Sequence, residues 1–174
     1  MDIWAEDEVH FQQHGSRCRM WVPPEIRDPV LRHAPTRKSV GYFGAVRIRD
    51  GKFVCQREAD RFNAQTCWDF LVKLKRAAGR SGRRVVVIID NAKYHHALLH
   101  REWRERYEPE FRLEFLPPYS PDLNPVERVW KLLRRLRLHN QYFPTLGAVL
   151  SSVEEQFAAW SQPNETLRKL CAIT

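Results

Sequence analysis

Five consecutive apolar and mostly β-branched residues, Val85-Val86-Val87-Ile88-Ile89, are followed at once by a single acid, Asp90. Such a run is typical of a strand that is buried on both faces of a sheet. It therefore predicts an α/β core and places a carboxylate at the carboxyl end of the strand. Ligands bind at that edge in open α/β sheets, so Asp90 is a candidate site residue.

Periodicity predicts the other elements of the fold. Alternating apolar residues predict strands over residues 3–11, 17–22, 39–48, 52–56 and 111–116, and an Asp50-Gly51 turn joins the third and fourth of them as a β-hairpin. Apolar residues at three- and four-residue steps predict helices over residues 63–79, from residue 124 onwards and over residues 145–160. Antiparallel strands followed by strand-helix alternation predict a mixed sheet with helices on both faces.

Length and composition narrow the class of protein. The 174 residues suit one domain, residues 1–174. Lysine and arginine exceed aspartate and glutamate by 29 − 21 = 8, which favours a polyanionic partner, although many basic proteins bind no nucleic acid. The chain has no uncharged apolar run near the roughly 18 residues of a membrane helix. Its four cysteines form no CxxC pair, which predicts reduced thiols in a cytoplasmic protein.

Three acids are candidates for one site: Asp7 at the end of the first predicted strand, Asp90, and Glu127 at the start of a helix. Carboxylates that are brought together repel one another unless a cation neutralises them. Divalent ions such as Mg²⁺ prefer oxygen ligands, and a pair of them catalyses in-line phosphoryl displacement. Three acids on a basic protein therefore suit metal-dependent chemistry on a phosphodiester.

Each acid also has a purely structural interpretation. Asp90 could form a turn or cap the following helix. With Asn124 as N-cap and Pro125 as the first helical residue, Glu127 would complete a capping box. Asp7 lies between Glu6 and Glu8, so local evidence leaves open which of these three acids is functional.

Basic residues near these acids are candidates for contacts with a phosphate backbone. Arg83 and Arg84 precede the buried strand, and the helix that starts after Asn124 carries four more on its polar side: Arg128, Lys131, Arg134 and Arg135. An ordinary solvated helix face explains these arginines equally well. His95, close to Asp90, could contact substrate or orient a water, or it could be a partly exposed structural histidine.

Three segments together resemble the DDE transposases of bacterial insertion sequences related to mariner elements. They are Trp4-Ala5-Glu6-Asp7-Glu8-Val9, the residues from Ile88 to His96 (IIDNAKYHH), and the residues from Leu116 to Trp130 (LPPYSPDLNPVERVW). The resemblance implies a ribonuclease-H-like mixed sheet, with three antiparallel strands and then parallel strands. It also implies that the catalytic and metal-binding residues are Asp7 on the first strand, Asp90 after the fourth and Glu127 on a later helix.

The resemblance further implies the activity and the partners. A transposase of this kind hydrolyses a phosphodiester at each element end and joins the freed 3′ hydroxyl to target DNA, using two Mg²⁺ or Mn²⁺ ions. Asp7 and Asp90 would bridge the ions, and Glu127 would hold the second ion and orient the attacking group. Lys93, His95 and Tyr119 lie within the matched motifs and would contact DNA together with the basic residues above. The active complex would be a homodimer in the bacterial cytoplasm, associated with the nucleoid.

Members of this family normally carry helix-turn-helix DNA-binding domains before the catalytic one, and the chain as given has none. We therefore expect another chain to supply a separate DNA-binding module. Two other functions stay open at this point. The protein could be an inactive or inhibitory DNA-binding remnant of a transposase, or a ribonuclease-H-like nuclease that cuts without specificity for element ends.

Overall fold

The computed structural model of the protein describes residues 1–27, 29–30, 32–58, 61–79, 82–118 and 120–173. The strands are β1 (Asp2–Gln12), β2 (Ser39–Arg47), β3 (Phe53–Glu58), β4 (Val85–Ile89) and β5 (Phe111–Phe115). The α-helices are α1 (Ala64–Gly79), α2 (Arg101–Tyr107), α3 (Val126–Arg137), α4 (Leu146–Trp160) and α5 (Glu165–Leu170). Three short 3₁₀ turns are η1 (Lys93–His96), η2 (Leu98–His100) and η3 (Pro121–Leu123).

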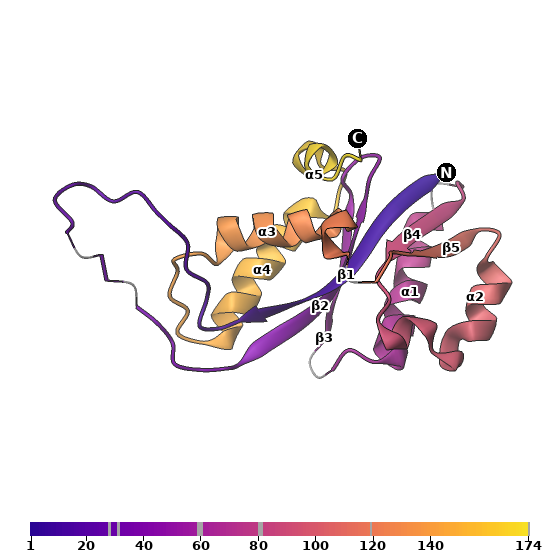
Figure 1. Ribbon diagram of the computed structural model, residues 1–174, viewed down its shortest axis with the longest axis horizontal. Helices are drawn as coiled ribbons and strands as arrows, with labels where there is room; N and C mark the ends of the chain where they lie inside the picture. Colours follow the sequence, from indigo (N-terminus) through magenta and orange to yellow (C-terminus); the bar gives the residue numbers. More distant parts are fainter. Residues whose placement is uncertain (28, 31, 59–60, 80–81, 119, 174) are drawn as a thin grey trace.

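The five strands form one mixed sheet in the order β3-β2-β1-β4-β5 (Figure 1). Strands β1, β2 and β3 pair antiparallel, whereas β4 and β5 run parallel to β1. This arrangement confirms the predicted mixed sheet of three antiparallel strands followed by parallel strands. It also makes β1 the central strand, because β1 joins the antiparallel half of the sheet to the parallel half.

Helices cover both faces of the sheet, as predicted, and β1 alternates between the two layers. Ala5, Val9 and Phe11 pack with α3 and α4 in one apolar cluster, while Trp4 packs with α1 in the other (Figure 1). The first cluster lies over the antiparallel strands. Val86 and Ile88 of β4 are consequently only half-buried, so the prediction that this strand is buried on both faces was wrong.

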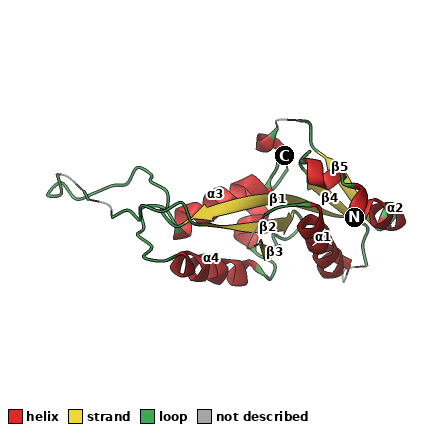
Figure 2. Cartoon of the chain, turned by 90° about the horizontal axis from the view of Figure 1, so that it is seen from below, coloured by secondary structure: helices red, strands yellow, loops and turns green. Residues whose placement is uncertain are grey.

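The prediction of a strand over residues 17–22 was also wrong. These residues form irregular chain within a long excursion between β1 and β2. The excursion projects away from the sheet, as Figure 1 and Figure 2 show, and Trp21 is 100% exposed. The backbone N–H and carbonyl of Cys18 instead pair with the Asn140 side chain, and Met20 and Trp21 lie exposed rather than against a sheet face. In the part of the chain that the structure describes, no helix has the length and apolar character needed to cross a membrane.

Candidate metal and nucleic-acid site

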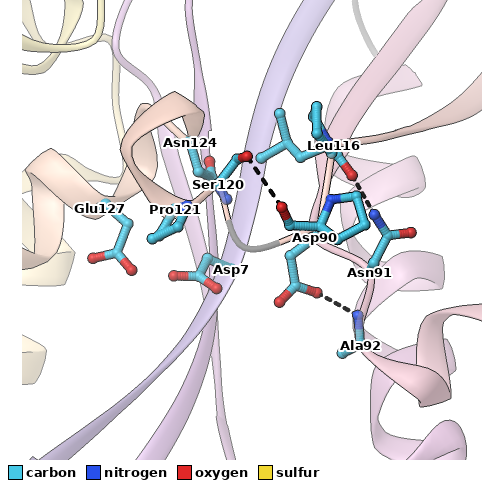
Figure 3. Close-up of a pocket in the computed structure, with 11 residues that line it drawn as sticks. Asp7, Asp90, Asn91, Ala92, Leu116, Ser120, Pro121, Asn124 and Glu127 are labelled. Atoms are coloured by element: carbon cyan, nitrogen blue, oxygen red, sulfur yellow. Dashed lines mark hydrogen bonds between the residues drawn. The ribbon is translucent and has the colours of Figure 1, made fainter.

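The three acids singled out in the sequence meet at one open cleft of about 550 Å³. The residues that line it are Asp7, Asp90, Asn91, Ala92, Leu116, Pro117, Pro118, Ser120, Pro121, Asn124 and Glu127. Figure 3 shows the carboxylates of Asp7, Asp90 and Glu127 opening into this cleft, with Asp7 drawn between the other two (Figure 3). They come from β1, from the end of β4 and from the first turn of α3, so distant parts of the sequence build the site.

The register of the parallel strands brings Asp7 and Asp90 together. The last pair of the β1–β4 ladder is Ala5 with Ile88, and the same register continued by two residues places Asp7 level with Asp90. The chain leaves β4 at this point, and the backbone N–H of Ala92 donates a 2.8 Å hydrogen bond to an Asp90 carboxylate oxygen. The amide of Asn91 donates to the carbonyl of Leu116, which ties the ends of β4 and β5 together.

Asp7 lies on the α3 side of the sheet, where Trp130 reaches it. The indole N–H of Trp130 donates a 3.2 Å hydrogen bond to Asp7 Oδ2. Trp130 itself is only 1% exposed. Gly44 pairs with Asp7 across the β1–β2 ladder, and a Cβ at Gly44 would collide with the Trp130 ring. The absence of a side chain on β2 therefore makes room for the indole that binds Asp7. In the sequence, Trp130 belongs to an apolar helix face and ends the third matched segment, and neither observation predicted this contact.

Glu127 owes its position to Asn124, which is 2% exposed and whose amide donates a 2.8 Å hydrogen bond to the Glu6 carbonyl on β1. This contact fixes the start of α3 against the central strand. The Asn124 side chain does cap the start of α3, because its Oδ1 accepts a 3.4 Å hydrogen bond from the Val126 N–H. The reciprocal contact of a capping box is not formed, because the N–H of Asn124 donates to the Pro121 carbonyl instead of to Glu127. Glu127 is therefore free to face the cleft.

The structure distinguishes Asp7 from Glu6, because alternate residues of a strand face opposite sides. Glu6 lies on the α1 face, where both of its carboxylate oxygens are buried without a hydrogen-bond partner among the described residues. Burial and the nearby charge of Glu8 raise the pKa of Glu6 well above its ordinary value. Asp7 alone of the three faces the cleft, and it is therefore the better candidate for the functional acid.

The negative charges of the carboxylates in and near the cleft repel one another. Burial, followed by the charges of Glu8 and Glu127, raises the pKa of Asp7 to about 8. In contrast, the pKa of Asp90 is lowered, chiefly by a hydrogen bond from His95 and further by the Ala92 N–H, against the effect of its partial burial. A cation in the cleft would relieve the repulsion on Asp7.

His95 is completely buried, at 0% exposure, and this corrects the expectation of a partly exposed histidine that contacts DNA. Its Nε2 lies 2.9 Å from Glu8 Oε1, and its Nδ1 lies 3.1 Å from Asp90 Oδ1. Burial by itself would lower the pKa of His95, but hydrogen bonds with Asp90, Cys67 and Glu8 raise it well above its usual value. Sequence reasoning missed this network because Glu8 and His95 are 87 positions apart in the chain.

The donor set of the cleft fits a divalent cation. One carboxylate oxygen from each of Asp7, Glu8 and Asp90 lies within 4.8 Å of the others, and Glu127 lines the same cleft. Hard divalent cations prefer such oxygen ligands, and after burial the negative charges of Glu8 and Glu127 contribute to the raised pKa of Asp7. Nitrogen and sulfur do not enter this group.

The predicted basic contacts are spread over the molecule. Lys93 is exposed in η1, three residues after Asp90, and Lys131 and Arg135 follow Glu127 at four-residue steps along α3 with Arg134 beside them. Arg128 instead donates to the carbonyls of Leu170 and Ala172 at the end of α5.

Arg83 and Arg84 lie apart from the cleft, and Tyr119 is not among the residues that the structure describes. Arg83 and Arg84 precede β4, at the opposite end of that strand from Asp90, and Arg84 pairs with Glu108 at 3.4 Å. Their contact with DNA stays a prediction that the geometry of the cleft does not support. Tyr119 lies outside the described residues.

Comparisons with known proteins agree with this architecture. Residues 2–150 match a protein family described as DDE superfamily endonuclease. The chain is 26% identical over 153 residues to a 39 kDa protein of insertion element IS630 from Shigella sonnei, a match that covers 87% of this chain and 43% of that protein. It is 30% identical over 142 residues to the transposase of transposable element Tc1 from Caenorhabditis elegans, covering 76% of this chain and 50% of the other.

A solved structure of the Mos1 mariner paired-end complex with Mn superposes on 97% of this chain and 51% of its own, with a TM-score of 0.72 and 22% identity. This likeness confirms the predicted ribonuclease-H-like fold. The chain spans about half the length of these three proteins.

Proposed function

The chain belongs to the DDE superfamily of endonucleases and is homologous to the IS630 and Tc1 transposases, and we propose that it is the catalytic domain of a DNA transposase. It hydrolyses a phosphodiester at each end of an insertion element and transfers the freed 3′ end into target DNA. The observation that carries this proposal is the convergence of Asp7, Asp90 and Glu127 on one cleft from three separate elements (Figure 3).

Asp7 and Asp90 would together hold divalent metal, and Glu127 would hold a second ion on the α3 side. The cofactor is Mg²⁺ or Mn²⁺, and the Mos1 structures that contain these metals support this assignment. When bound, such ions neutralise the phosphate charge and activate the attacking oxygen. Trp130 orients the Asp7 carboxylate through its indole N–H, and the Ala92 N–H orients Asp90. Glu127, a carboxylate on a fixed helix start, accepts a hydrogen bond from the attacking water or 3′ hydroxyl.

The DNA backbone would lie along the side of α3 that leads away from Glu127. Lys131, Arg134 and Arg135 continue that side of the helix, and Lys93 is exposed three residues after Asp90. Positive side chains in this position neutralise phosphates without reading the base sequence. This surface therefore binds DNA near the acids but does not select the element ends.

Selection of the ends would come from outside this domain. Because the chain spans about half the length of its transposase relatives, we assign end recognition to a DNA-binding module in another segment or another chain. The active complex would contain two copies, an assignment supported by the paired-end complexes of Mos1. It would act at the nucleoid in the bacterial cytoplasm, consistent with four free cysteines and an excess of positive charge.

The test is a nicking assay on DNA that carries the element ends, with Mn²⁺ or Mg²⁺ and the partner module present. Asp90→Asn and Glu127→Gln should each abolish cleavage while leaving the thermal unfolding temperature close to that of the wild type. Glu102→Gln, on the exposed surface of α2, is the matched control and should cut normally. Cleavage by the Asp90→Asn/Glu127→Gln double variant would rule out this active site. Cuts scattered along the DNA would instead favour a nuclease without end specificity.

A further inference from the structure

The backbone pairing of β1 with β4 ends two residues before Asp7 and Asp90. The ladder ends at Ala5 and Ile88, so it does not fix the separation of Asp7 and Asp90, which lie two residues further along. These two carboxylates repel one another unless a cation lies between them. Something other than the ladder must therefore hold the ends of the two strands together before metal arrives.

His95 is placed to do this. Its Nε2 lies 2.9 Å from Glu8 Oε1 on β1, and its Nδ1 lies 3.1 Å from Asp90 Oδ1 and 3.2 Å from the Asp90 carbonyl at the end of β4. One ring thus spans the gap between the strands at the level where the ladder has ended. Each of its two nitrogens faces a carboxylate from a different strand.

We propose that Glu8 and His95 form a buried strap that joins β1 to β4 and holds the Asp90 carboxylate at the distance from Asp7 that a divalent ion requires. This inference rests on the proposed metal-dependent function. His95 is a positioning residue in this account, because it acts through Asp90 and is completely buried away from substrate. Residues that orient metal ligands in this way typically alter metal affinity 10- to 100-fold when they are replaced.

The surroundings of the strap support a directed interaction. The His95 ring is closed off by Cys67 of α1 and by Tyr94, whose ring centroid lies 4.6 Å from that of His95. The Glu8 side chain is only 10% exposed. The His95–Glu8 hydrogen bond is therefore stronger than it would be in water, whereas the Asp90 side chain at the other end of the strap is 48% exposed. The strap also ends at the site itself, since a Glu8 oxygen lies within 4.8 Å of oxygens of both Asp7 and Asp90.

The test measures Mn²⁺ binding to the full chain without DNA, by the loss of the free Mn²⁺ signal in electron paramagnetic resonance. His95→Ala should raise the dissociation constant for Mn²⁺ by about tenfold or more. His100→Ala is the matched control, because His100 is equally buried nearby in the chain but its Nε2 hydrogen-bonds the Tyr94 carbonyl rather than a carboxylate. It should leave Mn²⁺ affinity within about twofold of the wild type, even if it lowers the unfolding temperature.

A double-variant cycle separates a strap from two independent contributions. If Glu8 and His95 act as one unit, Glu8→Ala/His95→Ala should bind Mn²⁺ no more weakly than the weaker single variant. Additive losses would overturn the strap, as would wild-type affinity in His95→Ala. His95→Gln retains a donor for one carboxylate, so an intermediate affinity supports the strap and provides the measurement if His95→Ala does not fold.

The same titration distinguishes this inference from the proposed function. If the wild type binds Mn²⁺, Asp90→Asn abolishes binding and His95→Ala binds normally, the metal centre stands and the strap alone is wrong. If the wild type binds no Mn²⁺, the metal centre is wrong and the strap fails with it.

Discussion

Three side chains near the carboxyl group of Asp7 have opposite effects on its pKa. Glu8 and Glu127 place negative charge near it and, with burial, raise its pKa to about 8, whereas the indole N–H of Trp130 favours the ionised form. Asp90 has a lowered pKa because His95 and the Ala92 N–H donate to it. The two central acids of the site thus differ in their pKa, and a metal ion bound between them would favour the ionised form of both.

This difference predicts how stability depends on pH. The pKa of Asp7 rises from 3.8 in an unfolded chain to about 8 in the folded protein. Between these values the folded state holds a proton that the unfolded state has released, so this group makes the free energy of unfolding fall as pH rises. Asp7→Asn removes the effect. In urea unfolding with a chelator present, its stability relative to the wild type should be greater at pH 8 than at pH 5. An equal difference at both pH values would contradict the prediction.

Among the secondary-structure elements, α3 connects the core to the site most directly. One side of it packs Val129, Trp130 and Leu133 against the sheet, and another presents Glu127 to the cleft. Trp130 belongs to both, because its ring fills the space over Gly44 and its N–H reaches Asp7. Packing between β2 and α3 therefore controls the position of an acid on β1.

A substitution in β2 should disturb the site through this contact. In Gly44→Ala, the new Cβ would collide with the Trp130 ring and with Phe53, so the indole must shift away from Asp7. Overpacking of this kind costs about 1–3 kcal/mol of stability. We expect that loss in urea unfolding, together with weaker Mn²⁺ binding.

Gly147→Ala is the control, because its Cβ would meet only the Thr145 hydroxyl oxygen, at 3.7 Å, within α4. Alanine is the better helix former, so this variant should be more stable by up to about 1 kcal/mol, with unchanged Mn²⁺ affinity. Normal Mn²⁺ binding by Gly44→Ala would contradict the proposed link between β2 and Asp7.

The elements that periodicity predicted correctly are those in which local pattern and tertiary packing agree. The run from Val85 to Ile89 forms β4, and the Asn63 side chain caps α1 by accepting from the N–H groups of Gln65 and Thr66. Residues 17–22 alternate like a strand, but the Cys18 backbone pairs with the Asn140 side chain, and Met20 and Trp21 are exposed. Local pattern does not show which segments pair across a sheet.

The same reasoning explains which parts of the site could be predicted. Asp7, Asp90 and Glu127 were found because acids at the ends of predicted elements, together with a resemblance to a known family, identify candidates. The roles of Glu8, His95 and Trp130 depend on pairs of residues that are 87 and 123 positions apart in the chain. No periodicity connects such pairs, so their contacts emerge only from the register of β1 with β4 and the packing of α3.

At the scale of the whole molecule, positive charge on one side of α3 should determine how the protein binds DNA. Lys131 and Arg135 are exposed and follow Glu127 along the helix. If both contact phosphates, Lys131→Ala/Arg135→Ala should reduce the slope of log affinity against log salt by about 2. The binding of a DNA duplex measured by fluorescence anisotropy at several salt concentrations gives this slope.

The matched control removes the same amount of charge from another part of the surface. Arg101 and Arg106 are exposed on α2, and Arg101 already pairs with Glu105 at 2.8 Å. Arg101→Ala/Arg106→Ala should leave the salt slope unchanged. Equal effects of the two double variants would show that binding reflects net charge alone and would remove α3 from the DNA surface.

The central claim is that Asp7, Asp90 and Glu127 form a divalent metal centre, and an Mn²⁺-soaked crystal of this chain tests it most directly. We expect an anomalous difference peak in the cleft. The Mn²⁺ ion at this peak should coordinate oxygens of both Asp7 and Asp90, with Glu127 facing it. The competing position is the group formed by Glu6, Glu8 and His95 on the other face of β1, whose ligand atoms also lie within 4.8 Å of one another. A peak there, or none in the cleft at saturating Mn²⁺, would contradict the account.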